Sequence, residues 1–489
     1  MQKSQNAAAL RYPVRFSVVL RHLGELTLVL GFLSLVPFAV SMLCGDYGIG
    51  LRYLLVAAGL FSFGLGLSKL PVTERIQTNE AMSITALAFL IAPLVMTYPM
   101  MGSGIHFLDA FFEAVSAVTT TGLSTTATLK GKLPSFLFAR AWMQWYGGLG
   151  MVVLALAILI KPGPTARHLG HMGDYEGDLI GATRAHARYI MRVYGVLTVA
   201  GFLLLLVFGI DWWNAVLYTF TAVSTGGFSP HDASLAALNG VGKQAAVILL
   251  SMTGAVSFIF YRRQFVKGPR AVLQERQTQC FLIAAMVSAG LIVAFLRFHH
   301  GFQWGPAVHH GILNAFSAQS TVGFSSMDIS QMDAGTKLVL MASMISGGCI
   351  GSTAGGIKIL RLIVLVRLLH LIVLKTALPR TAATDIKLEG RRLQSEDIHI
   401  ALGIILLFII CAGLSWFAFL TMGYDPINSL FEVVSALGTV GLSTGIAAPD
   451  LHPLLKGVLC ADMLLGRLEI LAWLVLLTPR NWIGKRWEG

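Results

Sequence analysis

Charged residues are scarce in this chain: Asp, Glu, Lys and Arg together make up 12% of its 489 residues. A soluble globular domain carries about 25%. Because 55% of the residues are hydrophobic, a folded chain of this length has too few charged side chains to cover a surface that faces water. The composition therefore excludes an ordinary soluble protein and favours one that is embedded in lipid.

Cysteine is also rare, and the five residues stand far apart in mostly apolar segments. They match neither the paired spacing of a zinc site nor that of a disulfide framework. We therefore expect them to be small core residues. They are Cys44, Cys280, Cys349, Cys411 and Cys460.

Long apolar runs occur along the whole chain, and about 20 such residues cross a bilayer as a helix. We expect no cleavable signal peptide, because the first run is longer than a signal core and no small-residue cleavage site is clear. We interpret it as a retained first helix. The plainest runs are residues 24–44, 53–68, 82–100, 195–210, 400–420 and 468–478.

The formal net charge of +12 would fit a nucleic-acid partner if placement were ignored. With a cytoplasmic N-terminus and each predicted span crossed in turn, all but nine of the 36 Lys and Arg residues fall on the cytoplasmic side. This asymmetry is the positive-inside rule. It predicts that both termini are cytoplasmic, and it explains the basic balance without nucleic acid.

After two N-terminal spans, one pattern occurs four times: an apolar run, a short semi-polar helix ending in a Thr/Gly/Ser element, and a second apolar run. Four such elements, at separations of 105, 96 and 118 residues, indicate internal repetition. The alternative is four ordinary helix–loop turns. The elements are FFEAVSAVTTTGLST (111–125), AVLYTFTAVSTGGFS (215–229), GILNAFSAQSTVGFS (311–325) and LFEVVSALGTVGLST (430–444).

The repeats divide the chain into five regions. We expect a two-helix region and then four pore repeats, so the fold class is all-α and membrane-embedded, with four pseudo-symmetric helix–pore-loop–helix units around one pore. The predicted boundaries are 1–76 for the two-helix region, then 77–165, 166–270, 271–385 and 386–489 for the repeats.

Each semi-polar helix is too short to span, so it must enter the membrane from outside and turn back. Non-helical backbone is tolerated at membrane depth only where it lines a cavity or is buried in protein. Four such segments therefore predict a shared aqueous axis.

The residue types of the element are those of a potassium filter, which replaces the hydration shell with backbone carbonyl oxygens and a threonine oxygen. Glycine supplies the unusual dihedrals at low steric cost, and the C-terminal ends of the short helices favour a cation. Thr-Val-Gly-Phe-Ser at 321–325 is close to the Thr-Val-Gly-Tyr-Gly of potassium channels. The predicted K⁺-binding residues are Thr120, Thr121, Gly122, Leu123, Thr225, Gly226, Gly227, Phe228, Thr321, Val322, Gly323, Phe324, Thr439, Val440, Gly441 and Leu442.

Two carboxylates precede this element. Glu113 and Glu432 lie nine residues before their glycines, about two turns back on the short helix. We favour a structural role for them over a role as ion ligands.

The sequence resembles the Trk/Ktr/HKT superfamily of potassium transporters, most closely the bacterial Trk-type membrane subunit (TrkH family), over nearly the whole chain. The resemblance rests on the four filter elements, on GGCIGSTAGGIKILR at 347–361 and on LLGRLEI at 464–470. It implies K⁺ uptake by a homodimer in the bacterial inner membrane. It further implies no cofactor in this chain and a cytosolic TrkA-like ring of regulatory subunits that bind nucleotides.

Two positions depart from the repeated pattern. Gly226 stands where other repeats have Thr or Val, and Gly438 stands where others have Thr or Ser. Neither change removes a filter glycine, but both make the four sides unequal. We expect less strict selectivity than in a symmetric channel.

A glycine-dense segment at 347–358 should break the second helix of the third repeat, because each glycine costs about 1 kcal/mol against alanine. The resemblance implies an intramembrane gate loop; a close-packed glycine helix interface is the alternative. Arg467, within a predicted span, would obstruct a cation there. The alternative is an ion pair with Glu469 or Asp462. The predicted gate residues are Gly347, Gly348, Gly351, Ser352, Thr353, Gly355, Gly356, Lys358 and Arg467.

Other functions fit less well. A proton- or sodium-coupled symporter would need carboxylates in discontinuous midplane helices, and the sequence has few. A membrane enzyme would need a His/Asp or carboxylate constellation, for which only the weak set His168, His171 and Asp174 qualifies. The pairs at 299–300 and 309–310 are expected to be solvated histidines on the outer face. We therefore predict a transport protein and not an enzyme.

Overall fold

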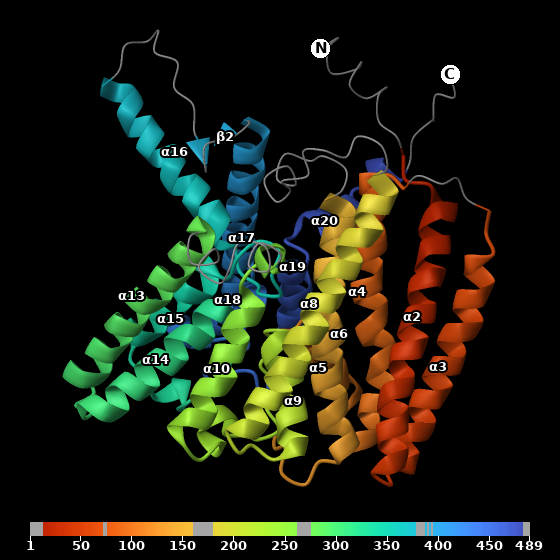
Figure 1. Ribbon diagram of the computed structural model, residues 1–489, viewed down its shortest axis with the longest axis horizontal. Helices are drawn as coiled ribbons and strands as arrows, with labels where there is room; N and C mark the ends of the chain where they lie inside the picture. Colours follow the sequence, from red (N-terminus) through yellow and green to blue (C-terminus); the bar gives the residue numbers. More distant parts are fainter. Residues whose placement is uncertain are drawn as a thin grey trace.

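The computed structural model describes residues 13–71, 76–159, 179–261, 275–377, 387–388, 391–392 and 395–482, with side chains outside 151–159, 179–186 and 387–392. Helices that stand side by side make up nearly all of this part (Figure 1). Its only strands, β1 (Lys387–Leu388) and β2 (Arg391–Arg392), form a short antiparallel pair. The predicted all-α membrane class is confirmed.

Six described helices are long and apolar enough to cross a bilayer. Their outer faces carry large apolar side chains that are more than half exposed, such as Phe32, Phe63, Ile283 and Phe417. An apolar surface of this extent is unfavourable in water and fits contact with membrane lipid. The six are α2 (Phe16–Leu43), α3 (Tyr47–Ser68), α4 (Thr78–Met100), α8 (Leu179–Val207), α13 (Arg276–Phe298) and α17 (Ser395–Thr421).

A proline inside a helix leaves the carbonyl four residues earlier without its usual N–H partner. In α2, Pro37 frees the carbonyl of Leu33 in this way. The indole Nε1 of Trp142 donates to that carbonyl at 2.9 Å. Such a side-chain contact satisfies a backbone group that lipid cannot.

Four shorter helices, one in each repeat, have their C-terminal halves buried inside the bundle. Three of them have 12 residues and the one in the third repeat has 17. They extend about 18 Å and about 26 Å, less than the roughly 30 Å of a hydrocarbon core. Each follows a long helix and precedes a second one, as the sequence predicts. The short helices are α5 (Phe107–Val118), α9 (Trp212–Val223), α14 (Trp304–Ser320) and α18 (Pro426–Leu437); the second helices are α6 (Pro134–Leu159), α10 (Val241–Ala255), α15 (Ala334–Ser346) and α19 (Pro453–Arg467).

The predicted break in the third repeat is present. Helix α15 ends at Ser346, the chain is non-helical through the glycine-dense segment, and α16 (Ile359–Ala377) then leads away from the bundle (Figure 1). We call residues 347–358 the gate loop.

A second break was not predicted. The apolar run 468–478 does not form one continuous helix with the residues before it, because α19 stops at Arg467 and α20 (Leu471–Leu477) begins after it. Between them, Glu469 and Ile470 have φ angles of 54° and 64°. Tertiary contacts described below hold these two residues in the left-handed region, which non-glycine residues rarely adopt.

Candidate cation site

The four Thr/Gly/Ser elements share one backbone conformation. The threonine of each has a φ angle between 48° and 55°, and the glycine two residues later has a φ between 76° and 94°. Left-handed threonine is uncommon and costs energy, so its recurrence in four segments indicates a shared requirement. The threonines are Thr120, Thr225, Thr321 and Thr439; the glycines are Gly122, Gly227, Gly323 and Gly441.

The four glycines lie in a closed ring. A Cβ atom at each would overlap the carbonyl oxygen of the residue before the next glycine in chain order, and the fourth repeat returns to the first. The repeats are therefore arranged around one axis in the order 1, 2, 3, 4. The contacting pairs are Gly122 with Gly226, Gly227 with Val322, Gly323 with Val440 and Gly441 with Thr121.

Side chains of the short helices hold the residues that follow the filter. In every repeat the helix residue that makes this hydrogen bond stands nine residues before the glycine. Glu113 also pairs with Arg140 at 2.9 Å. These contacts agree with a structural role for both carboxylates. Glu113 contacts Ser124 and Thr125, Tyr218 contacts Ser229, Asn314 contacts Ser326, and Glu432 contacts Ser443 and Thr444.

Gln144 on α6 contacts the second Thr/Gly/Ser element, and the sequence analysis missed it. Its Nε2 donates to the carbonyl of Gly226 at 2.5 Å, and its Oε1 accepts from the amide of Phe228 at 3.0 Å. A Cβ at Gly226 would overlap this side chain. Glycine at position 226 thus leaves room for the side-chain amide of Gln144, which hydrogen-bonds to the backbone of the second repeat. A polar side chain in the apolar run of α6, four residues after Arg140, was the available signal.

We expect Gln144→Met to lower both stability and ion selectivity, because two buried backbone groups lose their partners at about 1–3 kcal/mol each. Thermal unfolding and the K⁺/Na⁺ flux ratio measure the two effects. Gln244→Met is the matched control, since that buried amide donates to the carbonyl of Leu238 at 2.9 Å, outside the filter. Equal selectivity in the two variants would show that Gln144 does not shape the filter.

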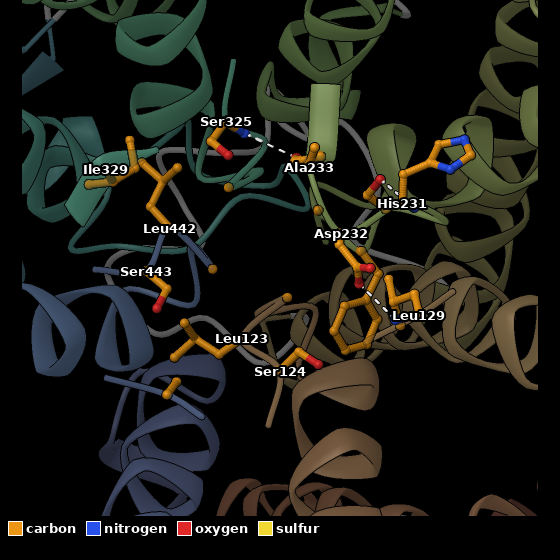
Figure 2. A pocket seen from close by; sticks show the side chains of 18 of the residues that line it. Leu123, Ser124, Leu129, His231, Asp232, Ala233, Ser325, Ile329, Leu442 and Ser443 are labelled. Carbon is orange, nitrogen blue, oxygen red and sulfur yellow. Dashed lines mark hydrogen bonds between the residues drawn. The ribbon is translucent and has the colours of Figure 1, made fainter. Parts of the chain in front are cut away.

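A cavity of about 470 Å³ opens on one side of the glycine ring. Figure 2 shows side chains from all four repeats around it. All four glycines line it, together with the serine that ends each element. Loops from two repeats are joined at its rim, where Asp232 accepts from the hydroxyl of Thr128 and the amide of Leu129, both at 2.7 Å. The cavity therefore leads directly to the ring.

The gate loop, named for the role that the sequence predicts, lies against the threonine ends of three of the elements. The amide of Gly355 donates to the hydroxyl of Thr321 at 2.7 Å, and the hydroxyls of Thr225 and Thr353 are 3.3 Å apart. The amide of Gly356 donates to the carbonyl of Gly438 at 3.0 Å. Two of the four filter threonines thus have their hydroxyls engaged by the loop.

The same loop packs against the backbone of Gly438, but a Cβ at Gly438 itself would meet the carbonyl oxygen of Val434 and not the loop, so the departure at this position has no structural explanation. A Cβ at Gly355 would overlap the carbonyl of Gly438 and the hydroxyl of Thr439. The two backbones therefore approach more closely than side chains allow, which only glycine permits.

Further contacts fix the two ends of the loop. Gln319 of α14 donates to the hydroxyl of Ser346 at 2.9 Å and to the carbonyl of Gly347 at 2.8 Å. At the other end, the Nζ of Lys358 donates to the carbonyl of Ala354. The loop thus has defined hydrogen-bond partners at both ends. The remaining predicted gate residues Gly348, Gly351 and Ser352 lie within it.

Arg467 is buried and contacts this loop. Its guanidinium donates to the carbonyl of Thr353 at 2.8 Å and to that of Gly147 at 3.1 Å. Neither acid proposed as its alternative partner forms an ion pair with it among the described residues: Glu469 pairs with Arg361 of α16, and Asp462 accepts from Ser415 at 2.7 Å. The charge of Arg467 is therefore held by carbonyl oxygens of the gate loop and of α6.

The break at 468–470 positions these charges. A Cβ at Gly466 would overlap the carbonyl of Leu437, so α19 packs directly on the last turn of α18. Glu469 then reaches Arg361 at the start of α16. This pair joins the fourth repeat to the end of the gate loop.

The remaining sequence predictions have mixed outcomes. All five cysteines are free thiols, and Cys349 and Cys460 are buried as expected. Cys44 is exposed just after α2, so the expectation of a core position is wrong there. The weak metal pattern of His168, His171 and Asp174 lies outside the described residues.

Comparison with known proteins agrees with this geometry. Residues 57–483 match the family model described as TrkH, cation transport protein. The Trk system potassium uptake protein TrkH of Escherichia coli is 27% identical over 96% of this chain and 100% of its own length. TrkI of Halomonas elongata is 28% identical over 96% and 97%.

The crystal structure of the potassium transporter TrkH from Vibrio parahaemolyticus superposes with a TM-score of 0.86 at 25% identity, covering 96% of this chain and 100% of that one. The family whose model matches this chain consists of transport proteins, so the prediction that this chain is not an enzyme is confirmed. The family model matches most of the chain, and the protein therefore belongs to the TrkH family of cation transport proteins.

Proposed function

We propose that this chain takes up K⁺ across the bacterial inner membrane through a filter formed by the glycine ring. The observation that carries the proposal is the ring of four left-handed glycines, each packed against a carbonyl of the neighbouring repeat. Such an arrangement offers carbonyl oxygens from four sides, as selective K⁺ coordination requires. The relatives named above as potassium uptake proteins support the same substrate.

The threonines add hydroxyl oxygens at the inner end of the filter. Those of Thr120 and Thr439 are buried and have no hydrogen-bond partner among the described residues. A desolvated cation would compensate for such orphaned oxygens. Those of Thr225 and Thr321 are engaged by the gate loop instead.

We infer that the gate loop and Arg467 form a barrier below the filter. The loop occupies two of the four threonine oxygens, and the buried guanidinium is held beside it. Opening would require the loop to leave Thr225 and Thr321, which frees the full ring of oxygens. The fourfold arrangement of free threonine hydroxyl oxygens would thus form only when the gate loop has moved away.

Passive flow is sufficient for uptake. The membrane potential supplies about 2.3 kcal/mol per charge per 100 mV, which concentrates a monovalent cation roughly 50-fold. A coupled symport remains the alternative and would need carboxylates that bind the coupling ion. Glu113 and Glu432, the acids nine residues before the filter glycines, are engaged by protein groups.

The assembly belongs to the proposal as well. We propose that the protein is a homodimer and that both termini of each chain are cytoplasmic. We also propose that each chain is divided into a two-helix region and four pore repeats at the boundaries given above. We also propose a nucleotide-binding cytosolic ring as its regulator, which would shift the pore by binding its open and closed forms unequally. Co-purification from the native host, followed by flux with added nucleotide, tests this. Absence of a soluble partner and of a nucleotide response would contradict it.

Growth at low external K⁺ tests the proposed substrate. A bacterial strain without its own K⁺ uptake systems should grow when it carries this chain, with and without the regulatory subunit. Gly122→Ser should reduce the preference for K⁺ over Na⁺, because serine at this position goes with sodium permeation in the resembled superfamily. Failure of the well-expressed parent chain to support growth would contradict K⁺ uptake.

A further inference from the structure

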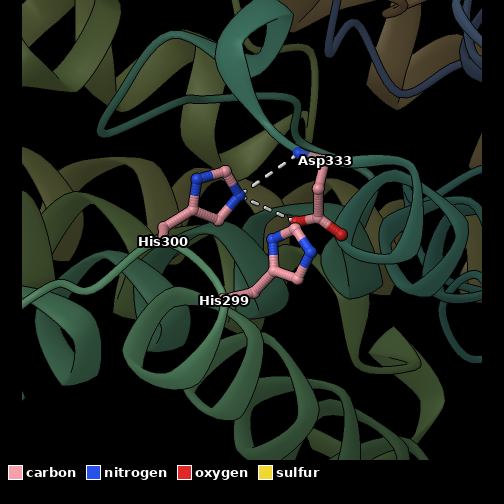
Figure 3. Close-up of side chains that lie close together, drawn as sticks. All are labelled: His299, His300 and Asp333. Carbon is pink, nitrogen blue, oxygen red and sulfur yellow. Dashed lines mark hydrogen bonds and ion pairs between the residues drawn. The ribbon is translucent and has the colours of Figure 1, made fainter.

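Three side chains that the proposed pore does not use meet at the ends of α13 and α15. One ligand atom from each of His299, His300 and Asp333 lies within 4.8 Å of the others, and Nε2 of His300 is 2.9 Å from Oδ1 of Asp333. Figure 3 shows the two imidazoles beside the carboxylate. The expectation that both histidines are solvated holds for His299 but not for His300, whose side chain is 25% exposed.

This set suits one class of ion. Imidazole nitrogen and carboxylate oxygen bind Zn²⁺ at about 2.0–2.2 Å, so the ligands of a tetrahedral ion are about 3.4 Å apart. Side-chain movements on the order of 1 Å would bring the three atoms to that spacing. Calcium and magnesium prefer oxygen ligands throughout. A water molecule would supply the fourth ligand of the ion.

The backbones of all three residues are held in place. Asp333 is the N-cap of α15, accepting from the amide of Thr336 at 3.1 Å and from its hydroxyl at 2.6 Å. The amides of His299 and His300 donate to the carbonyl of Phe295 at 2.9 and 3.2 Å. Ligands on ordered backbone lose little freedom when they bind an ion.

A plain ion pair accounts for only two of the three residues. His300 and Asp333 satisfy each other, but the imidazole of His299 makes no hydrogen bond in the part of the chain that the structure describes. Its ring contacts the His300 ring, at a centroid distance of 5.5 Å. An exposed third imidazole at ligand distance is the feature that a metal site explains.

We propose that His299, His300 and Asp333 form an outward-facing site for a transition-metal dication of the Zn²⁺ class. The bound ion would tie the end of α13 to the start of α15. Because α15 runs from Ala334 to Ser346 and leads into the gate loop, this tie restrains the loop and slows K⁺ flux. The restraint rests on the proposed function, whereas the binding of the ion does not.

Metal titration of the purified protein tests the site directly. Zn²⁺ is titrated calorimetrically, and Co²⁺ is followed by its visible absorption, which is strong in four-coordinate geometry. We expect one bound ion to be lost, or its affinity to fall at least tenfold, in His299→Ala and in His300→Ala. His299 is exposed, so its replacement leaves the fold intact.

His106→Ala is the matched control, because His106 is another exposed histidine, at the N-terminus of α5. It should bind as the parent does. Parent-like binding in both His299→Ala and His300→Ala would overturn the site, since histidines elsewhere would then account for all bound metal.

Flux measurement separates the restraint from the site. Zn²⁺ added outside proteoliposomes should slow K⁺ flux several-fold in the parent and in His106→Ala, but not in His299→Ala. If titration shows the site and Zn²⁺ leaves parent flux unchanged, the proposed restraint of α15 is wrong. If the parent passes no K⁺ at all, the proposed function fails, while the titration still decides the site.

Discussion

Replacing Arg467 with alanine should raise K⁺ flux per folded molecule by about tenfold to a hundredfold. Two positive charges about 6 Å apart repel by roughly 3 kcal/mol at an effective dielectric of 20, and the substitution removes that repulsion. It also frees the carbonyl of Thr353 from its donor, which loosens the gate loop. Deletion within 351–356 should raise flux further, because it removes the plug itself.

The measurement is K⁺ flux in liposomes, normalised to folded protein, together with thermal unfolding. Some loss of stability is expected, since two buried carbonyls lose a donor at about 1–3 kcal/mol each. Arg467→Lys should give intermediate flux, because it keeps the charge but not the forked contact. Arg52→Ala is the control for loss of an outer arginine that contacts the carbonyl of Tyr98. Poor expression of Arg467→Ala with unchanged unit flux would contradict the barrier.

Gly323→Ala should lower K⁺ flux and the K⁺/Na⁺ ratio at least tenfold. The added Cβ overlaps the carbonyl oxygen of Val440, and the φ of 78° is strained for any residue with a side chain. The fourth repeat must then shift, and its oxygens leave the coordination ring. Because selective coordination depends on the positions of all four carbonyls, a shift on one side affects every ion that passes.

Gly131→Ala separates strain from contact. Its φ of 83° imposes the same conformational cost, but nothing lies within 4 Å of its added Cβ. This variant should keep the K⁺/Na⁺ selectivity of the parent. Its free energy of unfolding should fall by about 1–2 kcal/mol, the same conformational cost of a positive φ that Gly323→Ala carries. Unchanged selectivity in Gly323→Ala would mean that the glycine ring is not the filter.

Much of the architecture was predictable because lipid constrains it strongly. Backbone polar groups must be satisfied within the chain, so apolar length predicts spans and four short helices predict a shared axis. The break between α15 and α16 was predictable for a local reason as well: five glycines within ten residues, 347–356, cannot form a stable helix interior.

The features that were missed depend on contacts between distant parts of the chain. The run at 468–470 contains neither glycine nor proline, and its break is held by the Glu469–Arg361 pair and by the packing of Gly466 on α18. Gln144 lies 82 residues from its partner Gly226. The gathering of His299, His300 and Asp333 likewise requires the relative placement of α13 and α15.

The role of the carboxylates was predictable in kind but not in detail. A position two turns before the glycine indicates a structural side chain, whatever its chemistry. The structure adds that the four repeats use Glu, Tyr, Asn and Glu at the same position for the same purpose. Different residue types thus make the same kind of hydrogen bond at one position of the repeat. A search of the repeats for identical residues does not detect this equivalence.

Flux of K⁺ and Na⁺ through the purified parent protein in liposomes tests the central claim most directly. The two ions are tested separately at equal concentrations, and uptake is driven by an inside-negative potential. No proton gradient is present in either assay, and no sodium gradient is present in the K⁺ assay. The carbonyl ring predicts that K⁺ enters under this potential and that Na⁺ enters at least tenfold more slowly. Equal rates for the two ions, or K⁺ entry only when a proton or sodium gradient is added, would contradict a passive potassium filter.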